Sequence, residues 1–179
     1  VDAVVFIGGL NKGDHQDSEG ADRLQLGLPY GQDAVIGALA EANPNLAVAI
    51  VSGNAVAMPW IDRVPAVLEA WYSGSEAGNA LADVLFGAVN PSGKLPFTFP
   101  VRLEDCSAHS AGEYPGNGQV VYRDGIFVGY RWIEKERIEP LFAFGHGLSY
   151  TTFDIANVQA DRTSLATTGR LRVSADVTN

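Results

Sequence analysis

The chain has few of the residues from which several kinds of site are built. Of its 179 residues, one is cysteine, three are histidine and 12 are lysine or arginine, against 21 aspartates and glutamates. A single cysteine excludes a disulfide framework or a thiolate metal cage within the chain. The net charge of -9 argues against nucleic acid and anionic membrane surfaces as partners, because both are bound mainly by basic side chains that neutralise phosphates.

Long apolar runs are also missing. The longest, residues 46–51, is far shorter than the roughly 20 residues that span a bilayer. No basic segment followed by an apolar one opens the chain, as a secretory signal would require. We therefore expect no membrane-inserted segment.

The few thiol and imidazole groups do not form a nucleophilic pair in the sequence. Cys106 lies in a polar stretch with His109 three residues further on, and this spacing is no evidence of a dyad. We interpret Cys106 as a spectator thiol. His146 stands between two glycines and is expected to occupy a packed, structural turn.

Apolar runs typical of strands alternate with helical stripes in the first half of the chain. Strands are predicted at residues 4–7, 46–51 and 66–71, and helices at residues 33–42 and 77–85. Ser73 and Glu76 have the spacing of a capping box, and Gly87 is placed to end the second helix. The alternation predicts an α/β fold, a mostly parallel sheet with helices on both faces.

The pattern changes twice in the second half. From Asn90 onward, proline, glycine and aromatic residues follow one another without a clear period, which predicts a long excursion that could form a wall of an active site. After Phe153, residues 171–177 alternate apolar and polar side chains like a half-buried strand. We therefore expect two units, an α/β domain over residues 1–153 and the start of an all-β sandwich over residues 154–179.

Two glycine-rich segments fail as nucleotide sites. Residues 87–94 place five residues, not four, between the glycines of a phosphate loop, and Leu95 follows the lysine in place of Ser or Thr. Residues 8–13 do not match G-x-G-x-x-G and open into a polar loop. A nucleotide-binding domain is therefore disfavoured.

An acidic loop follows the first strand and contains Asp14, Asp17, Glu19 and Asp22. Calcium binding is one interpretation, but the alternate acidic positions and the distal glutamate of an EF-hand are missing. A merely solvated loop is a second interpretation. A third is catalytic: ligands of open α/β sheets bind outside the carboxyl ends of the strands, where Glu19 is expected to lie. One carboxylate, however, lacks the partner that most carboxylate chemistry needs.

Six motifs in order carry a resemblance to a known family. They are Ser18-Glu19-Gly20-x-Asp22-Arg23, Met58-Pro59-Trp60, Ala70-Trp71-Tyr72-x-Gly74-x-Glu76-x-Gly78-x-Ala80, Asn90-Pro91-Ser92-Gly93-Lys94-Leu95-Pro96, Phe127-Val128-Gly129-Tyr130-Arg131 and Phe144-Gly145-x-Gly147-Leu148-Ser149-Tyr150-Thr151. Up to about Phe153 the chain closely resembles the C-terminal half of family 3 glycoside hydrolases, the β-glucosidase and β-xylosidase group. The tail resembles the opening strands of the fibronectin type III-like domain that follows in many members.

The resemblance implies a retaining β-glycosidase, in the first instance a β-glucosidase, acting on a β-glucoside or a related oligosaccharide without metal or other cofactor. It implies that Glu19 is the general acid/base, that Gly20 lets the backbone turn tightly beside it, and that Asp22 and Arg23 brace the loop as an ion pair. The nucleophilic Asp would lie in an N-terminal TIM-like barrel, so the chain is expected to be part of a longer polypeptide and inactive alone. The resemblance does not identify the residues that bind substrate. A non-catalytic module that binds carbohydrate or supports another domain is the alternative.

Overall fold

The computed structural model describes residues 1–114, 116 and 118–179. Its strands and helices, in chain order, are β1 (Val4–Gly9), α1 (Gln32–Ala42), β2 (Leu46–Val51), η1 (Ile61–Arg63), β3 (Ala66–Glu69), η2 (Gly74–Glu76), α2 (Ala77–Leu85), η3 (Leu103–Asp105), α3 (Ser107–Ser110), α4 (Tyr130–Glu136), β4 (Asp154–Ala160) and β5 (Val173–Thr178). No helix of the described residues is long and apolar enough to cross a membrane.

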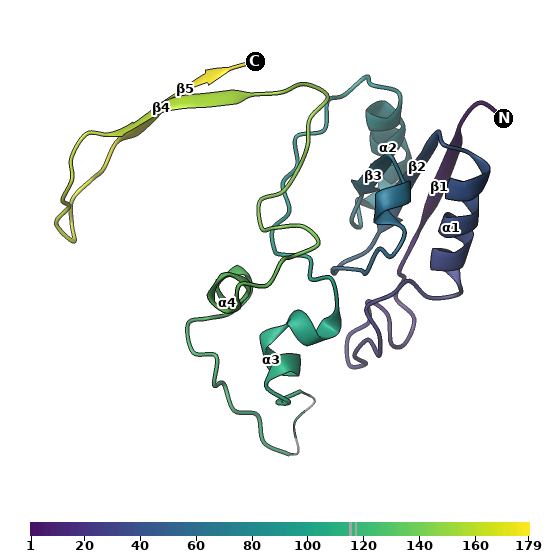
Figure 1. Ribbon diagram of the computed structural model, residues 1–179, viewed down its shortest axis with the longest axis horizontal. Helices are drawn as coiled ribbons and strands as arrows, with labels where there is room; N and C mark the ends of the chain where they lie inside the picture. Colours follow the sequence, from purple (N-terminus) through teal and green to yellow (C-terminus); the bar gives the residue numbers. More distant parts are fainter. Residues whose placement is uncertain (115, 117) are drawn as a thin grey trace.

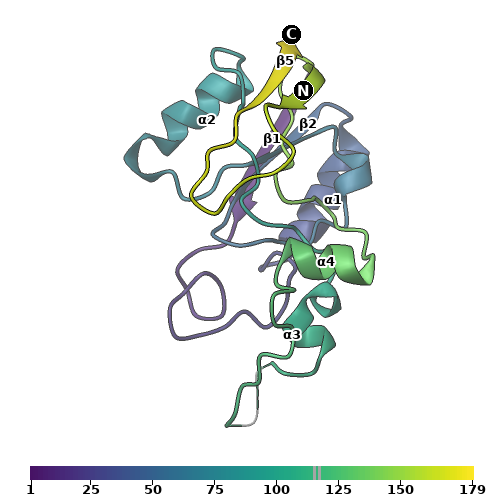
Figure 2. The same cartoon turned by 90° about the vertical axis from the view of Figure 1, so that its left-hand side faces the viewer.

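The first unit is built on a three-stranded parallel sheet in the order β1-β2-β3. Val4 is paired with Leu46, and Ala47 with Ala66, so all three strands end at the same edge. Helices α1 and α2 lie on opposite sides of the sheet in both views (Figures 1 and 2). The α/β class expected from the alternating pattern is confirmed.

The middle strand supplies much of the core. The side chains of Val48 and Ile50 in β2 are almost fully buried, as is Ile36, which α1 directs toward the sheet. Trp60 and Phe99 are each 1% exposed and are the largest fully buried side chains. The apolar run at residues 46–51 is therefore the buried, central strand that its composition predicts.

Of the two signals predicted for the ends of α2, only the one at its C-terminus is found. The capping box is wrong: η2 precedes α2, and the Ser73 hydroxyl donates to the carbonyl of Ala70 at 2.6 Å, so it does not cap the helix. The C-terminal glycine is confirmed, because Gly87 follows the helix with a φ of +77°. Only glycine adopts that conformation at little cost.

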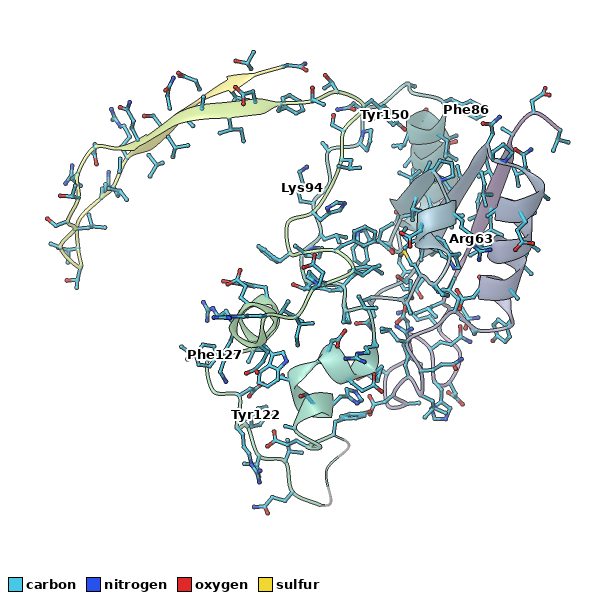
Figure 3. The ribbon with its side chains drawn as sticks, viewed as in Figure 1. Arg63, Phe86, Lys94, Tyr122, Phe127 and Tyr150 are labelled. Atoms are coloured by element: carbon cyan, nitrogen blue, oxygen red, sulfur yellow. The ribbon has the colours of Figure 1, made fainter. Side chains whose placement is uncertain are left out.

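The excursion after α2 packs on the core and on α2. Two of its own residues, Phe99 and Phe142, form an isolated antiparallel bridge, and their rings pack edge to face at 6.2 Å. Phe99 is part of the buried core, and Phe142 packs against that core. Figure 3 shows Tyr150 close to α2, where its hydroxyl donates to the carbonyl of Val84 at 2.6 Å. The segment is therefore anchored to the core at its middle and at its end.

The tail forms a separate two-stranded antiparallel sheet of β4 and β5. In Figure 1 this hairpin projects away from the parallel sheet. The strand expected over residues 171–177 is found at Val173–Thr178. The division into units at residue 153 stays a prediction.

Candidate active site

The candidate site begins where β1 ends. Gly9, its last residue, has a φ of +140°, and a Cβ there would lie 2.0 Å from the carbonyl oxygen of Val51. Leu10 then donates its N–H to the same carbonyl at 2.8 Å before the chain leaves the sheet. A glycine is therefore needed at the point where the acidic loop starts.

Glu19 lies at the tip of a tight turn within this loop. Ser18 and Ala21 form an isolated antiparallel bridge, so Glu19 and Gly20 are the two residues between them. Gly20 has a φ of +85°, the left-handed conformation that the second central residue of such turns requires. The side chain of Glu19 is exposed, so the turn presents its carboxylate to solvent beyond the carboxyl edge of the sheet.

The two residues expected to brace the loop do not pair with each other. The half-buried Arg23 guanidinium donates to the carbonyls of Ala55 at 2.6 Å and Leu26 at 2.8 Å. Asp22 is exposed, and its main-chain carbonyl oxygen lies 2.9 Å from Nδ1 of His15. The ion pair expected between Asp22 and Arg23 is therefore wrong, because the Arg23 guanidinium turns inward to these two main-chain carbonyls.

The carboxylate that anchors the loop is Asp17. It accepts hydrogen bonds from the N–H of Gly53 at 2.6 Å, the Asn54 amide at 3.2 Å and the Tyr72 hydroxyl at 2.9 Å. Burial opposes ionisation of Asp17, but these three bonds and the charge of Arg23 outweigh it, and the net pKa of Asp17 is lowered. An ionised carboxylate two residues before Glu19 thus ties the loop to the turns that follow β2 and β3.

A second acid, Glu69, lies at the end of β3. Its Oε1 lies 3.1 Å from the hydroxyl oxygen of Ser52 and accepts from the N–H of Trp71 at 3.3 Å, whereas Oε2 is buried without a partner among the described residues. Burial raises the pKa of Glu69 to about 7; the bonds from Trp71 and Ser52 oppose the rise, and the charge of Asp17 adds to it.

The contacts of Asp17, Ser52 and Glu69 could not be predicted from the sequence motifs. Asp17 appears in the sequence only as one of four acids in a polar loop. Glu69 carried a usable signal, because a carboxylate at the end of an apolar strand-forming run is expected to face either solvent or a polar site. Nothing local marks Ser52.

Other chemistry-bearing residues lie outside this arrangement. Cys106 is partly buried, and burial raises the pKa of its thiol, which does not favour a nucleophile. The ring of His146 packs 4.8 Å from that of Phe142, in keeping with a structural turn. In the part of the chain that the structure describes, no group of three or more His, Cys, Asp or Glu side chains is placed to hold a metal ion.

The protein-family model of the glycosyl hydrolase family 3 C-terminal domain matches the sequence over residues 1–150. The chain belongs to glycosyl hydrolase family 3. The resemblance carried by the six motifs is thereby confirmed.

Family 3 relatives match nearly the whole chain. It is 51% identical to beta-glucosidase BoGH3A of Bacteroides ovatus, over 99% of this chain and 24% of the relative. It is 46% identical to thermostable beta-glucosidase B of Acetivibrio thermocellus, over 99% of this chain and 23% of the relative. The chain thus spans about a quarter of the length of the curated relatives it matches.

Solved structures of family 3 share the fold. The beta-glucosidase DesR of Streptomyces venezuelae, crystallised with D-glucose, superposes with a TM-score of 0.89 at 42% identity, over 98% of this chain and 22% of that chain. A beta-glucosidase of Bifidobacterium adolescentis gives 0.87 at 38% identity, over 98% and 25%. The parallel sheet, its helices and the hairpin therefore recur together in solved family 3 enzymes.

Proposed function

We propose that this chain supplies the general acid/base, Glu19, of a retaining β-glucosidase. The observation that carries the proposal is the turn at residues 18–21, which presents an exposed carboxylate beyond the carboxyl edge of a parallel sheet. Membership of family 3 and relatives named as beta-glucosidases support the same chemistry.

A retaining glycosidase needs a second carboxylate about 5 to 5.5 Å from the first. Asp17 and Glu69 do not fit that role, because Asp17 is engaged by three hydrogen bonds and the carboxyl group of Glu69 is largely buried. The nucleophile is proposed to be an Asp of a TIM-like barrel in a longer polypeptide. Relatives about four times as long as this chain leave room for such a domain.

The two carboxyl groups then divide the reaction. In the first step the barrel Asp attacks the anomeric carbon, while protonated Glu19 gives its proton to the departing glycosidic oxygen. In the second step the Glu19 carboxylate takes a proton from water as that water attacks the anomeric carbon and displaces the barrel Asp carboxylate, which restores both groups. The proton thus leaves and returns through one side chain, held at the tip of a turn that Asp17 anchors.

The test is substitution of Glu19 in the full-length polypeptide. Glu19→Ala is expected to lower turnover of β-glucosides with poor leaving groups by about a hundredfold or more, since proton transfer by a positioned side chain contributes about that much. Added azide should restore turnover of an activated aryl glucoside and yield β-glucosyl azide. Asp14→Ala, in the same loop, is the matched control and should keep activity. Unchanged activity in Glu19→Ala would rule out the role.

A further inference from the structure

The hydroxyl of Ser52 has one hydrogen but lies within hydrogen-bond distance of two oxygen atoms. Ser52 Oγ lies 2.7 Å from the carbonyl oxygen of Asn54 and 3.1 Å from Oε1 of Glu69. A hydroxyl donates a single hydrogen, so only one of these contacts can be a donation by Ser52. The carbonyl of Asn54 has no hydrogen to give and is the closer of the two. The contact with Glu69 is therefore complete only when the hydrogen between Ser52 and Glu69 comes from Glu69.

The other contacts of Glu69 also favour a protonated side chain. Oε2 is buried and unpartnered among the described residues, and an ionised carboxylate with one oxygen left without a donor is costly. If Glu69 ionises, Ser52 is drawn to the carboxylate and gives up the Asn54 carbonyl. The bond that closes the turn at residues 52–54 is then lost.

That turn is one of the supports of the candidate site. Asp17 is held by the N–H of Gly53 and the amide of Asn54, and Asp17 in turn holds the loop that ends in Glu19. We propose that Glu69 is a positioning residue for Glu19: protonated Glu69 donates to Ser52, Ser52 holds the 52–54 turn, and the turn fixes Asp17 and the catalytic loop. The proposal rests on the acid/base role proposed for Glu19.

The surrounding charges favour the proton on Glu69. Asp17 faces it from the loop after β1, and Tyr72 faces it from the segment after β3. The charge of Arg23 acts on Asp17 and Tyr72. Lys12 lies further out, with Nζ 4.9 Å from the centre of the Tyr72 ring. Asp17 is negative and is already satisfied by three donors, so it opposes a second negative charge at Glu69.

The experiment compares Glu69→Gln with wild type in the full-length enzyme across the pH range. An amide nitrogen donates to Ser52 at every pH, so Glu69→Gln mimics the protonated acid and loses only the long bond from Trp71, a cost that does not vary with pH. The ratio of kcat in Glu69→Gln to kcat in wild type cancels the titration of Glu19, which both share. We expect this ratio to rise by up to about tenfold between pH 6 and pH 8, as one ionisation predicts.

Two controls test whether a rise in the kcat ratio comes from Glu69 acting through Ser52. Glu134→Gln replaces an exposed glutamate on α4 and should give a ratio that is flat with pH. Ser52→Ala removes the hydroxyl that links Glu69 to the 52–54 turn, so adding Glu69→Gln to it should no longer change the pH profile. A flat ratio for Glu69→Gln, or the same rise in the Ser52→Ala background, would overturn the proposal.

A spectroscopic measurement separates this proposal from the catalytic one. Infrared difference spectra of wild type minus Glu69→Gln should show a protonated carboxyl band at pH 6 that is lost by pH 8. The band does not depend on activity, so it would persist even if Glu19→Ala proved that Glu19 is not the acid/base. Absence of the band at pH 6 would show that Glu69 is ionised and would contradict the inference directly.

Discussion

Asp17 and Glu69 are carboxyl groups at one edge of one sheet, yet their surroundings move their proton affinities in opposite directions. Asp17 receives three hydrogen bonds and faces Arg23, so its pKa is lowered although burial opposes ionisation. Glu69 is more deeply buried and has fewer donors, so its pKa is raised to about 7. Adjacent acids with opposed shifts commonly mark a site in which one group is fixed as an anion and the other holds a proton. Here Asp17 lies in the same loop as Glu19, the proposed catalytic residue, and Glu69 lies at the end of β3.

The raised pKa of Glu69 makes local stability depend on pH. Burial raises it from 4.5 to about 7, so the folded state holds one proton more than the unfolded state between these values. The free energy of opening therefore falls as pH rises through this window and is lowest above pH 7. One pKa unit corresponds to about 1.4 kcal/mol, so this shift lowers the free energy of opening by about 3 kcal/mol above pH 7.

Hydrogen exchange measures this dependence. We expect amides of residues 50–54 and 66–72 in wild type to lose protection relative to Glu69→Gln as pH rises from 5 to 8, by up to about a hundredfold in exchange rate. Comparing both proteins at the same pH removes the intrinsic pH dependence of exchange. Equal protection of the two proteins at every pH would contradict the shift.

At the scale of elements, one carboxylate joins the start of α1 to two loops. Asp33, in the first turn of α1, accepts the N–H of Leu28 at 3.1 Å and the indole Nε1–H of Trp60 at 2.8 Å. Trp60 is 1% exposed, so its N–H has no access to water if Asp33 is removed. Asp33 therefore links the helix to the end of the acidic loop and to the segment after β2.

Asp33→Ala should loosen these elements together. Leaving a buried indole N–H unpaired costs about 1 to 3 kcal/mol, so amides of residues 24–42 should exchange roughly ten times faster or more. Trp60→Phe, which removes the donor and keeps most of the ring, should cost less. Asp62→Asn, at an exposed acid of η1, is the control and should leave exchange unchanged. A similar effect of Asp33→Ala and Asp62→Asn would argue against the link.

The elements themselves could largely be predicted from sequence, whereas the support of the site could not. The predicted strand at residues 46–51 matches β2, and the predicted helix at residues 33–42 differs from α1 by one residue, because both depend on local apolar patterns. The partners of Asp17 lie 36 to 55 residues away along the chain, so their contacts depend on strand register and turn geometry. The position of Glu19 after a strand made it a candidate acid, and the family motif around it gave the candidate a specific role.

At the scale of the whole molecule, the candidate acid Glu19 is exposed, and two grooves lie elsewhere on the described residues. One groove, between the sheet and α2, is mostly apolar, and its walls include Ile7, Leu68, Leu81 and Val84. A second lies along the β4–β5 hairpin, among Asp161, Arg162 and Arg172. Neither includes Glu19 or Asp17. A sugar at Glu19 would therefore touch this chain on one side only.

This geometry separates half of an active site from an independent carbohydrate-binding module. Small-molecule sites usually bury most of their ligand, so the isolated chain should give no measurable heat with glucose or an aryl glucoside, whereas the full-length polypeptide should bind both. Circular dichroism of the isolated chain must first show folded structure, since an unfolded chain would also fail to bind. Glu19→Gln in the full-length polypeptide should retain glucose binding while losing turnover, because it removes proton transfer and keeps the shape of the site. Binding of glucose by the folded, isolated chain would instead favour a module with its own sugar site.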